Sequence, residues 1–392
     1  MSIEFPLSGR GLLSPRVATS FGHEARRAAH RRQPAGARFA SPLARIILGR
    51  TLLGGIARAV ACVAVGGILS ILTAEAIAYA NADPRGLMYD VGGGRRMRMV
   101  CEGQADPTRP TVVFEAGAFG FSGDWAHVQA LMTAQGVRSC AYDRAGMGLS
   151  DPSPEPRDGV NVARDLEKLL AAARIPGPLV LVGHSMAGSR LELFANRNRG
   201  RVRGLVFVDT TPSDVMDAKP VHDYVASFAD GAQAAARTAP FGILRLLAVT
   251  SLGDKTGLPA EQDLEKRWTF GSPGVDRVAA LESKSWPLVA QQALQSGRVD
   301  PRIPVAVVSA GIIESDEDPM MKSVQPRPAL ASDRGYVDVV DGATHHSILG
   351  AHYAPAIAKG VDFVLKAAGD RNKDGVRFAT VFEGQTQMAA RD

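Results

Sequence analysis

The sequence predicts an α/β fold built on a mostly parallel, eight-stranded sheet that carries helices on both of its faces. Short apolar runs alternate along the chain with stretches of helical periodicity, an order typical of strands joined by crossover helices. Several runs, such as PLVLVGH at 178–184, are almost wholly apolar, so their side chains are expected to be buried on both sides of the sheet. The alternation stops between residues 210 and 302 and then resumes, which predicts an insertion within one fold.

The first part of the core is expected over residues 86–210. Its opening run places three glycines at 92–94 between two strand-like stretches, which predicts a hairpin. Further strands are expected at 110–117, 137–143, 178–184 and 201–209. Residues 123–136 and 158–174 have helical spacing, and Asp158 is a candidate N-cap of the second helix. The apolar face of that helix would be formed by Val162, Leu166, Leu169 and Leu170.

The insertion, residues 211–302, is expected to be helical and to form a lid after the sixth strand. Such a lid would lie over the carboxyl ends of the strands, where open parallel sheets place their sites. The core resumes over residues 303–369, with strands at 303–310 and 336–342 and a last helix at 354–369. Residues 370–392 are expected to form a polar C-terminal tail.

The positive charge of the chain lies mostly in its first 58 residues, which hold ten arginines, no lysine and two glutamates. Because the formal net charge of the whole chain is +5, residues 59–392 are left slightly acidic, near −3. The arginine excess therefore does not indicate a nucleic-acid partner for the globular part. Residues 1–55 are predicted to be a disordered, arginine-rich arm.

Residues 59–74 contain no charged side chain, and with their flanks they extend the apolar segment to residues 56–80. About 20 apolar residues suffice for a helix that spans a membrane. The arginines before this segment predict that the arm stays in the cytoplasm and that the rest of the chain lies on the periplasmic side. We therefore expect a membrane anchor of one helix, or a secreted protein if cleavage occurs after AYA at 78–80.

Ser185 is a candidate nucleophile, because it stands between an expected strand and an expected helix. The nucleophile motif of this context reads Gly-x-Ser-x-Gly, and the sharp turn needs small residues two places before and after the serine. Gly183 meets the first requirement, whereas Ala187 replaces the second glycine. We interpret Ala187 as a substitution that the turn tolerates.

A serine hydroxyl needs a base and an acid that orients the base. Two histidines, His345 and His346, follow the last expected strand, and His345 is the favoured base. Two places offer the acid. Asp209 ends the sixth strand, and a loop after the seventh strand holds Glu314, Asp316 and Asp318, of which Asp316 leads. The sequence leaves the choice between Asp209 and Asp316 open.

The oxyanion that forms during acyl transfer needs N–H donors. The backbone amide of Met186, directly after the nucleophile, is one candidate donor. The second is the backbone amide of Ala118, in the glycine-rich run EAGAFGFSG that follows the strand at 110–117. Glycines in this run permit a close approach of the backbone to a substrate. No metal and no cofactor is expected.

These motifs together resemble the α/β-hydrolase fold superfamily, in its serine-nucleophile branch with exported or membrane-anchored members. The matching pieces cover about residues 86–210 and 303–368 and include EAG at 115–117, DRAGMGLS at 143–150, GHSMAG at 183–188 and THHSIL at 344–349. The resemblance implies a scaffold role for Asp143, Gly146 and Gly148. It also implies that Cys101 and Cys140 lie on neighbouring strands, where an exported protein could join them in a disulfide.

The resemblance implies a serine hydrolase that cleaves an ester or related acyl bond of a small molecule through an acyl-enzyme. Dehalogenases and epoxide hydrolases of the superfamily carry an aspartate at the nucleophile position, where this chain has Ser185. Two alternatives stay open: another acyl chemistry on the same residues, such as peptidase, C–C hydrolase or perhydrolase activity, and a non-catalytic, membrane-tethered binding module.

Overall fold

The computed structural model describes residues 42–248, 256–314, 318–369 and 379–380. Helix α1 (Pro42–Ala80) begins before the expected position, so residues 42–55 are helical although the arm was predicted to include them. The rest of the predicted arm lies outside the described residues. By length and composition alone, Gly54–Ala80 qualifies as a membrane span, a test that a signal sequence also passes.

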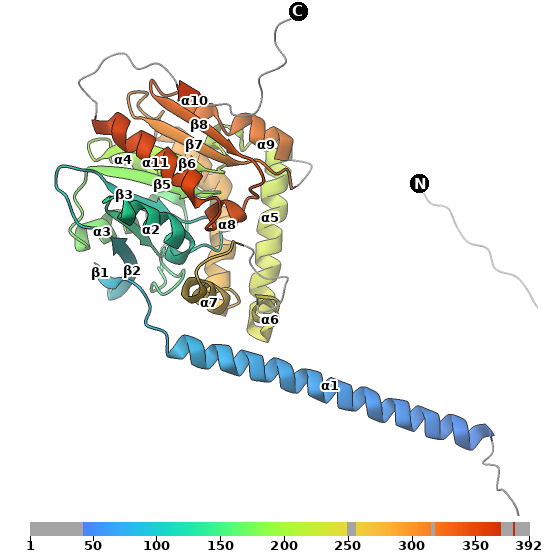
Figure 1. The fold of residues 1–392 in the computed structure, drawn as a ribbon. Coiled ribbons are helices and arrows are strands. Elements are labelled where there is room, and N and C mark those ends of the chain that lie inside the picture. The colour runs from blue at the N-terminus through green and yellow to red at the C-terminus, as the bar shows by residue number, and fades with distance from the viewer. Residues whose placement is uncertain (1–41, 249–255, 315–317, 370–378, 381–392) are drawn as a thin grey trace, which may run out of the picture. The chain divides into compact units, whose positions relative to one another are not determined.

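A nine-stranded sheet forms the centre of the fold (Figure 1), with the spatial order β1-β2-β4-β3-β5-β6-β7-β8-β9. The strands are β1 (Leu87–Gly92), β2 (Arg95–Glu102), β3 (Thr111–Glu115), β4 (Ser139–Tyr142), β5 (Leu179–His184), β6 (Val202–Val208), β7 (Val305–Ala310), β8 (Gly335–Val340) and β9 (Ala379–Thr380). Strand β2 is antiparallel to β1 and to β4, and the other neighbouring pairs are parallel. The predicted fold class is confirmed, and the two-residue β9 extends the expected eight strands into the segment predicted as a polar tail.

The two faces of the sheet bury different helices because successive side chains of a strand point to opposite sides. Leu181 of β5 and Phe207 of β6 pack in one core with helices α3 (Gly159–Ala172) and α4 (Ala187–Arg197). Their neighbours Val182 and Val206 pack in a second core with α2 (Ala126–Ala134) and α11 (Ala354–Gly369). The continuous apolar runs of the sequence follow from this burial on both sides.

Helix α3 begins where the sequence predicts. The Asp158 carboxylate accepts a hydrogen bond of 2.9 Å from the backbone amide of Asn161, which satisfies one of the free amides in the first turn. The predicted apolar face is buried in full, through Val162, Leu166, Leu169 and Leu170. The cap and the buried face together explain why this stretch of the chain is helical.

The insertion between β6 and β7 contains helices. They are α5 (Lys219–Thr238), α6 (Ile243–Ala248), α7 (Ala260–Thr269) and α8 (Pro273–Gln295). Trp286 of α8 is buried in a cluster that includes Met186, directly after the candidate nucleophile, and Val225 of α5. Two short helices follow β7, α9 (Asp318–Val324) and α10 (Arg327–Leu330). The insertion therefore contributes side chains next to Ser185.

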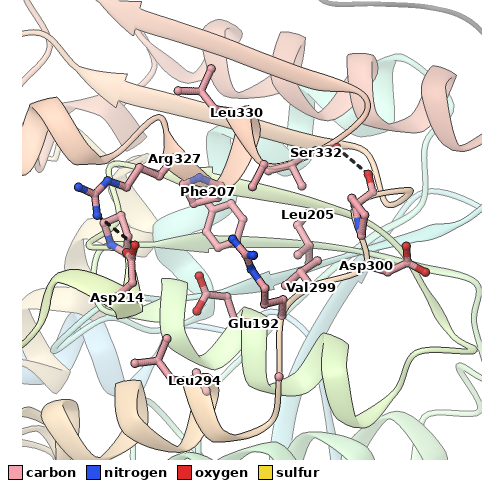
Figure 2. Close-up of a pocket in the computed structure, with 18 residues that line it drawn as sticks. Glu192, Leu205, Phe207, Asp214, Leu294, Val299, Asp300, Arg327, Leu330 and Ser332 are labelled. Atoms are coloured by element: carbon pink, nitrogen blue, oxygen red, sulfur yellow. Dashed lines mark hydrogen bonds and ion pairs between the residues drawn. The ribbon is translucent and has the colours of Figure 1, made fainter.

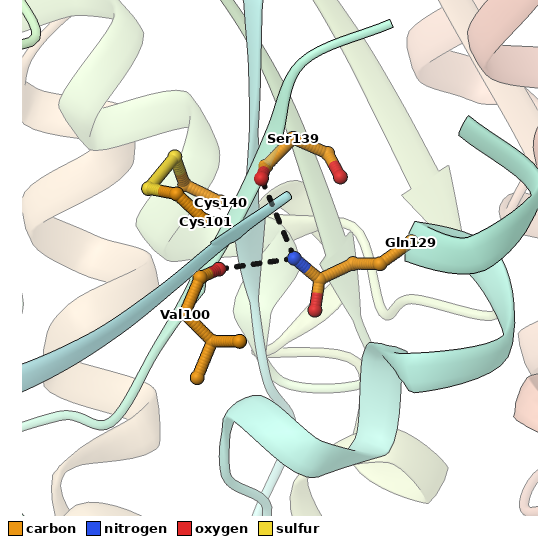
Figure 3. Close-up of a disulfide and its surroundings, with 5 residues drawn as sticks. All are labelled: Val100, Cys101, Gln129, Ser139 and Cys140. Atoms are coloured by element: carbon orange, nitrogen blue, oxygen red, sulfur yellow. Dashed lines mark hydrogen bonds between the residues drawn. A yellow bond between two sulfur atoms is a disulfide. The ribbon is translucent and has the colours of Figure 1, made fainter. Parts of the chain in front are cut away.

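A disulfide joins β2 to β4 (Figure 3). Cys101 and Cys140 lie opposite each other in the antiparallel pair and form the bond. Beside it, the Gln129 side chain donates hydrogen bonds to the backbone carbonyls of Val100, at 3.0 Å, and Ser139, at 3.4 Å. The pairing that the family resemblance implied is present, while Cys62 of α1 is a free thiol.

Candidate active site

Ser185 occupies a tight turn between β5 and α4, with a backbone φ of +60°. A residue other than glycine rarely adopts this left-handed backbone conformation. The turn projects the Ser185 hydroxyl away from both elements. A Cβ added at Gly183 would lie 2.7 Å from Leu191 Cδ1 and 3.0 Å from the Ala187 Cβ. A side chain at position 183 would therefore crowd Leu191 and Ala187, while the Ala187 methyl group is itself fully buried. This packing accounts for the departure from the Gly-x-Ser-x-Gly pattern.

His345 lies in the loop between β8 and α11, and its ring bridges Ser185 and Asp209. Its Nε2 is 3.0 Å from Ser185 Oγ, and its Nδ1 is 2.6 Å from Asp209 Oδ2. A carboxylate only accepts hydrogen bonds, so Nδ1–H donates to Asp209 and Nε2 is left to accept from the Ser185 hydroxyl. The His346 ring instead meets the His345 ring edge-on, with 5.4 Å between the ring centroids.

Asp209 follows β6 directly, with a φ of +46°, and both of its oxygens are occupied. While Oδ2 faces His345, Oδ1 accepts from the Ala310 amide at 3.0 Å, Lys322 Nζ at 2.6 Å and Gln325 Nε2 at 3.1 Å. Burial alone would raise the pKa of the Asp209 carboxyl, but the hydrogen bonds and charges of His345 and Lys322 hold it below its usual range. The group therefore stays an anion at neutral pH.

The loop after β7 holds the alternative acids of the sequence, Glu314, Asp316 and Asp318. Asp316 falls outside the described residues, and Asp318 begins α9. Glu314 is near the site, where its Oε2 accepts a hydrogen bond of 2.8 Å from the backbone amide of His345. Its carboxylate thus holds the His345 backbone, whereas Asp209 contacts the His345 ring.

Three further polar side chains of the site escaped the sequence analysis. Lys322 and Gln325 come from α9 and the residue after it, and no motif marks them. His184 directly precedes the nucleophile in the chain. Its Nε2–H donates to the His345 carbonyl at 2.9 Å, and burial, then the nearby His345, lower its pKa well below the usual range. His184 therefore stays neutral and supports the loop that carries His345.

The two predicted oxyanion amides, of Ala118 and Met186, belong to segments that meet at Ser185. A Cβ added at Gly117 would lie only 3.0 Å from the Ser185 Cβ, so the loop after β3 passes directly beside the serine. The side chains of Ala118 and Met186 share one apolar cluster. No described residue accepts a backbone hydrogen bond from either amide.

A pocket of about 240 Å³ lies beside Ser185, Asp209 and His345. Polar and apolar side chains share its walls: Ser185, Asp209, Thr211, Tyr224, Trp286, Glu314, Met321, Lys322, Gln325, His345 and His346. Tyr224 and Trp286 come from α5 and α8, so the insertion forms the apolar side of the pocket. Within the described parts of the chain, no group of three or more His, Cys, Asp or Glu side chains could hold a metal ion.

A larger cavity of about 660 Å³ lies away from Ser185, among α4, α8 and α10 (Figure 2). Its floor is apolar, with Leu205 and Phe207 of β6, and Arg327 pairs with Asp214 at 3.0 Å on one side. Glu192 of α4 also lines this cavity and hydrogen-bonds Ser213. The residues around the cavity include no histidine, so it lacks the base that a serine nucleophile needs.

The Glu192 carboxyl gives this cavity a pH-dependent effect on stability. Burial raises its pKa from 4.5 to about 7, against the opposing hydrogen bond from Ser213. Between these values the folded state binds more protons than the unfolded state, so stability present below pH 4.5 is lost as the pH rises through 7. We expect Glu192→Gln to remove this loss, which is at most about 3 kcal/mol between pH 4.5 and pH 8.

Urea unfolding of both proteins at pH 5 and pH 8 measures the effect. Glu155→Gln, on the exposed loop before α3, is the control and should behave as the wild type does. Parallel pH profiles for the wild type and Glu192→Gln would contradict the expected titration.

Comparison with known proteins gives one family match. The model of the "Alpha/beta hydrolase family" matches residues 112–358, more than half of the chain. Among curated proteins, an uncharacterised protein of Schizosaccharomyces pombe is 32% identical over 178 residues, 45% of this chain and 32% of its own length. The mouse "sn-1-specific diacylglycerol lipase ABHD11" is 31% identical over 123 residues, 31% of this chain and 39% of its own. An uncharacterised vacuolar membrane protein of Saccharomyces cerevisiae is 30% identical over 113 residues, 28% of this chain and 17% of its own.

The curated relatives thus match only part of their own length, from about a fifth to two fifths. Solved structures match far more of the chain at lower identity. The haloalkane dehalogenase DbeA of Bradyrhizobium elkani is 19% identical, with a TM-score of 0.55, and the match covers 72% of this chain and 97% of that one. The epoxide hydrolase CorEH is also 19% identical, with a TM-score of 0.54, and the match covers 71% of this chain and 98% of that one. At this identity the likeness concerns the fold alone.

Proposed function

Because the chain belongs to the α/β-hydrolase family, we propose that it is a serine hydrolase that cleaves an ester or related acyl bond of a small molecule. The observation that carries the proposal is the continuous chain of hydrogen bonds from Ser185 Oγ through His345 to Asp209. Nucleophile, base and orienting acid converge in it with the separations that acyl transfer needs. The diacylglycerol lipase among the relatives supports ester chemistry.

In the proposed mechanism, Ser185 Oγ attacks the substrate carbonyl carbon while its proton passes to His345 Nε2. Asp209 holds the ring in the required tautomer and stabilises the imidazolium that forms. The amides of Ala118 and Met186 donate to the oxyanion. His345 then protonates the leaving alcohol or amine, which leaves the acyl group on Ser185. A water molecule, deprotonated by His345, releases the acid and restores the serine.

The size of the pocket favours a small acyl group. Sites for drug-sized ligands are usually about 300–1,000 Å³, whereas this pocket is about 240 Å³. Tyr224, Trp286 and Met321 offer an apolar surface beside Ser185. We therefore propose short-chain or compact acyl esters as substrates, and a preference for p-nitrophenyl butyrate over the palmitate ester would agree.

A fluorophosphonate probe tests the function directly, because it forms a covalent bond with an activated serine. Labelling of the purified full chain, followed by mass spectrometry of its peptides, should place one label on Ser185. Heat-denatured protein is the control, since the label depends on the folded arrangement. A native, folded sample that takes no label and hydrolyses no p-nitrophenyl ester would refute the proposal.

We also propose that α1 anchors the protein in a membrane, with the hydrolase part on the extracytoplasmic side, or free if the helix is cleaved. The arginine-rich flank supports the orientation, and the vacuolar membrane protein among the relatives supports membrane association. The Cys101–Cys140 disulfide supports an oxidising compartment.

A fusion of alkaline phosphatase after residue 85 tests this orientation in a Gram-negative host, since that enzyme is active only in the periplasm. We expect an active fusion. A matched fusion after residue 41, before the helix, should be inactive. The reverse pattern would place the hydrolase part in the cytoplasm.

A further inference from the structure

Arg144 is among the largest fully buried side chains of the protein, with 1% of its surface exposed. It follows β4 in the DRAGMGLS run at 143–150. Its guanidinium lies under the loop that carries the Ala118 amide. Nη1 donates to the Ala116 carbonyl at 2.7 Å, and Nη2 donates to the Gly117 carbonyl at 2.8 Å. Two successive carbonyls of the oxyanion loop are thus held by one rigid, planar group.

The bond to Gly117 acts on the amide of Ala118, because both belong to the same peptide unit. In a planar trans peptide the C=O and the following N–H point in opposite directions. A guanidinium that holds the Gly117 carbonyl on the buried side therefore turns the Ala118 N–H toward the opposite side. Gly117 itself lies against Ser185, since a Cβ added there would be 3.0 Å from the Ser185 Cβ. The Gly117 carbonyl also accepts a longer hydrogen bond of 3.3 Å from the Gly120 amide, so Arg144 is the nearer of its two described donors.

Arg144 is itself held from the insertion. Its Nε donates to both oxygens of Glu282 on α8, at 3.1 and 2.9 Å, and Nη1 donates to Glu115 at 3.0 Å. Glu282 is fully buried and also pairs with Arg157, at 3.1 Å, and with Arg190, at 3.2 Å. Burial would raise the pKa of Glu282, but these arginines lower it to about 2. The carboxylate is an anion that holds Arg144 at its Nε, while Nη1 and Nη2 contact the loop.

We propose that Arg144 is a positioning residue, which orients the Ala118 N–H toward the oxyanion through the Gly117 carbonyl and is fixed in turn by Glu282 of α8. The inference rests on the proposed function. The contact between Glu282 and Arg144 links the insertion to the oxyanion loop. A substrate that contacts Trp286 therefore contacts α8, the helix that carries Glu282.

Arg144→Lys tests the proposal, because lysine keeps the buried charge but replaces the planar fork with a single ammonium group. One ammonium cannot reach Glu282 and the two carbonyls together. We expect kcat for p-nitrophenyl butyrate to fall about 100-fold, as for the loss of an oxyanion donor, with KM changed less than about threefold. Affinity for an alkyl boronic acid, whose tetrahedral adduct on Ser185 presents an oxyanion, should fall in parallel with kcat.

Arg157→Lys is the matched control. Arg157 pairs with Glu282 and with Asp165 in the same buried cluster but has no bond to the oxyanion loop. Arg157→Lys should lose about as much thermal stability as Arg144→Lys does, but its kcat should stay within about threefold of the wild type. Equal kcat losses in Arg144→Lys and Arg157→Lys would reduce Arg144 to a structural role and overturn the inference.

A second pair of variants covers the case in which Arg144→Lys does not fold. Glu282→Gln weakens the hold on Arg144, and Asp165→Asn weakens the neighbouring Arg157 pair. We expect a kcat about tenfold lower in Glu282→Gln only, and equal rates in the two variants would overturn the inference. If the wild type is active and labelled, equal rates in the two variants refute the positioning role alone. An unlabelled, inactive wild type refutes the proposed function as well.

Discussion

Replacement of Ser185 by alanine is expected to lower kcat for ester hydrolysis about a million-fold, the effect of removing the nucleophile from a serine triad. His345 and Asp209 would keep their 2.6 Å contact in the variant, because it does not involve the serine. What is lost is the covalent route. Any remaining rate would come from water that attacks a substrate bound against the Ala118 and Met186 amides.

Ser189→Ala is the control for this experiment. Ser189 lies one turn further along α4, is fully buried and bonds Ser213 rather than the pocket. It should keep kcat within about threefold of the wild type and should still take a fluorophosphonate label. Ser185→Ala should take none. A Ser185→Ala protein that retains a tenth of the wild-type rate would show that another group performs the chemistry.

The sequence carries much of the information for the nucleophile and base, because both depend on local patterns. Ser185 is marked by the strand before it and the small residues around it, and His345 by its place after the last core strand. Among the described residues, the His345 ring is the histidine with hydrogen bonds to Ser185 Oγ and Asp209 Oδ2. Such short-range patterns require no knowledge of which strands are neighbours.

The acid was not decided by sequence because both candidate places lie at one edge of the sheet. Strands β6 and β7 are parallel neighbours, so their carboxyl ends, followed by Asp209 and by the loop with Glu314, lie side by side. Which carboxylate reaches the His345 ring depends on the path of two loops, to within a few ångströms. Lys322 and Gln325 were missed for the same reason, since only the fold brings α9 to Asp209.

The buried cluster of Glu115, Arg144, Arg157, Arg190 and Glu282 could not be predicted from the sequence, for a different reason. Glu115 and Arg144 stand in the quoted motifs, but an isolated charged residue after a strand predicts solvent exposure as readily as a buried pair. Glu282 lies in the insertion, 138 residues from Arg144 along the chain. No local sequence pattern predicts a pairing between residues so far apart in the chain. Each buried charge is nevertheless stable only because the opposite charges are present.

Asp209→Asn is expected to lower kcat about ten-thousand-fold, because it traps His345 in the wrong tautomer. The donors on Oδ1, from Ala310, Lys322 and Gln325, would keep the amide oxygen of the new side chain on their side. Its NH₂ group would then face His345 Nδ1, which must accept the hydrogen bond. The proton of the neutral ring would move to Nε2, where it blocks proton transfer from the Ser185 hydroxyl.

Glu314→Gln separates this effect from a general loss of charge near the site. The glutamine oxygen can still accept the hydrogen bond from the His345 backbone amide, and the ring is not contacted. We expect kcat within about threefold of the wild type for Glu314→Gln and, because Asp209 already contacts the His345 ring, for Asp316→Asn. A large loss in Asp316→Asn with a mild effect of Asp209→Asn would reverse the proposed assignment. Single-turnover release of p-nitrophenol resolves the outcomes, since the wrong tautomer slows acylation of Ser185 itself.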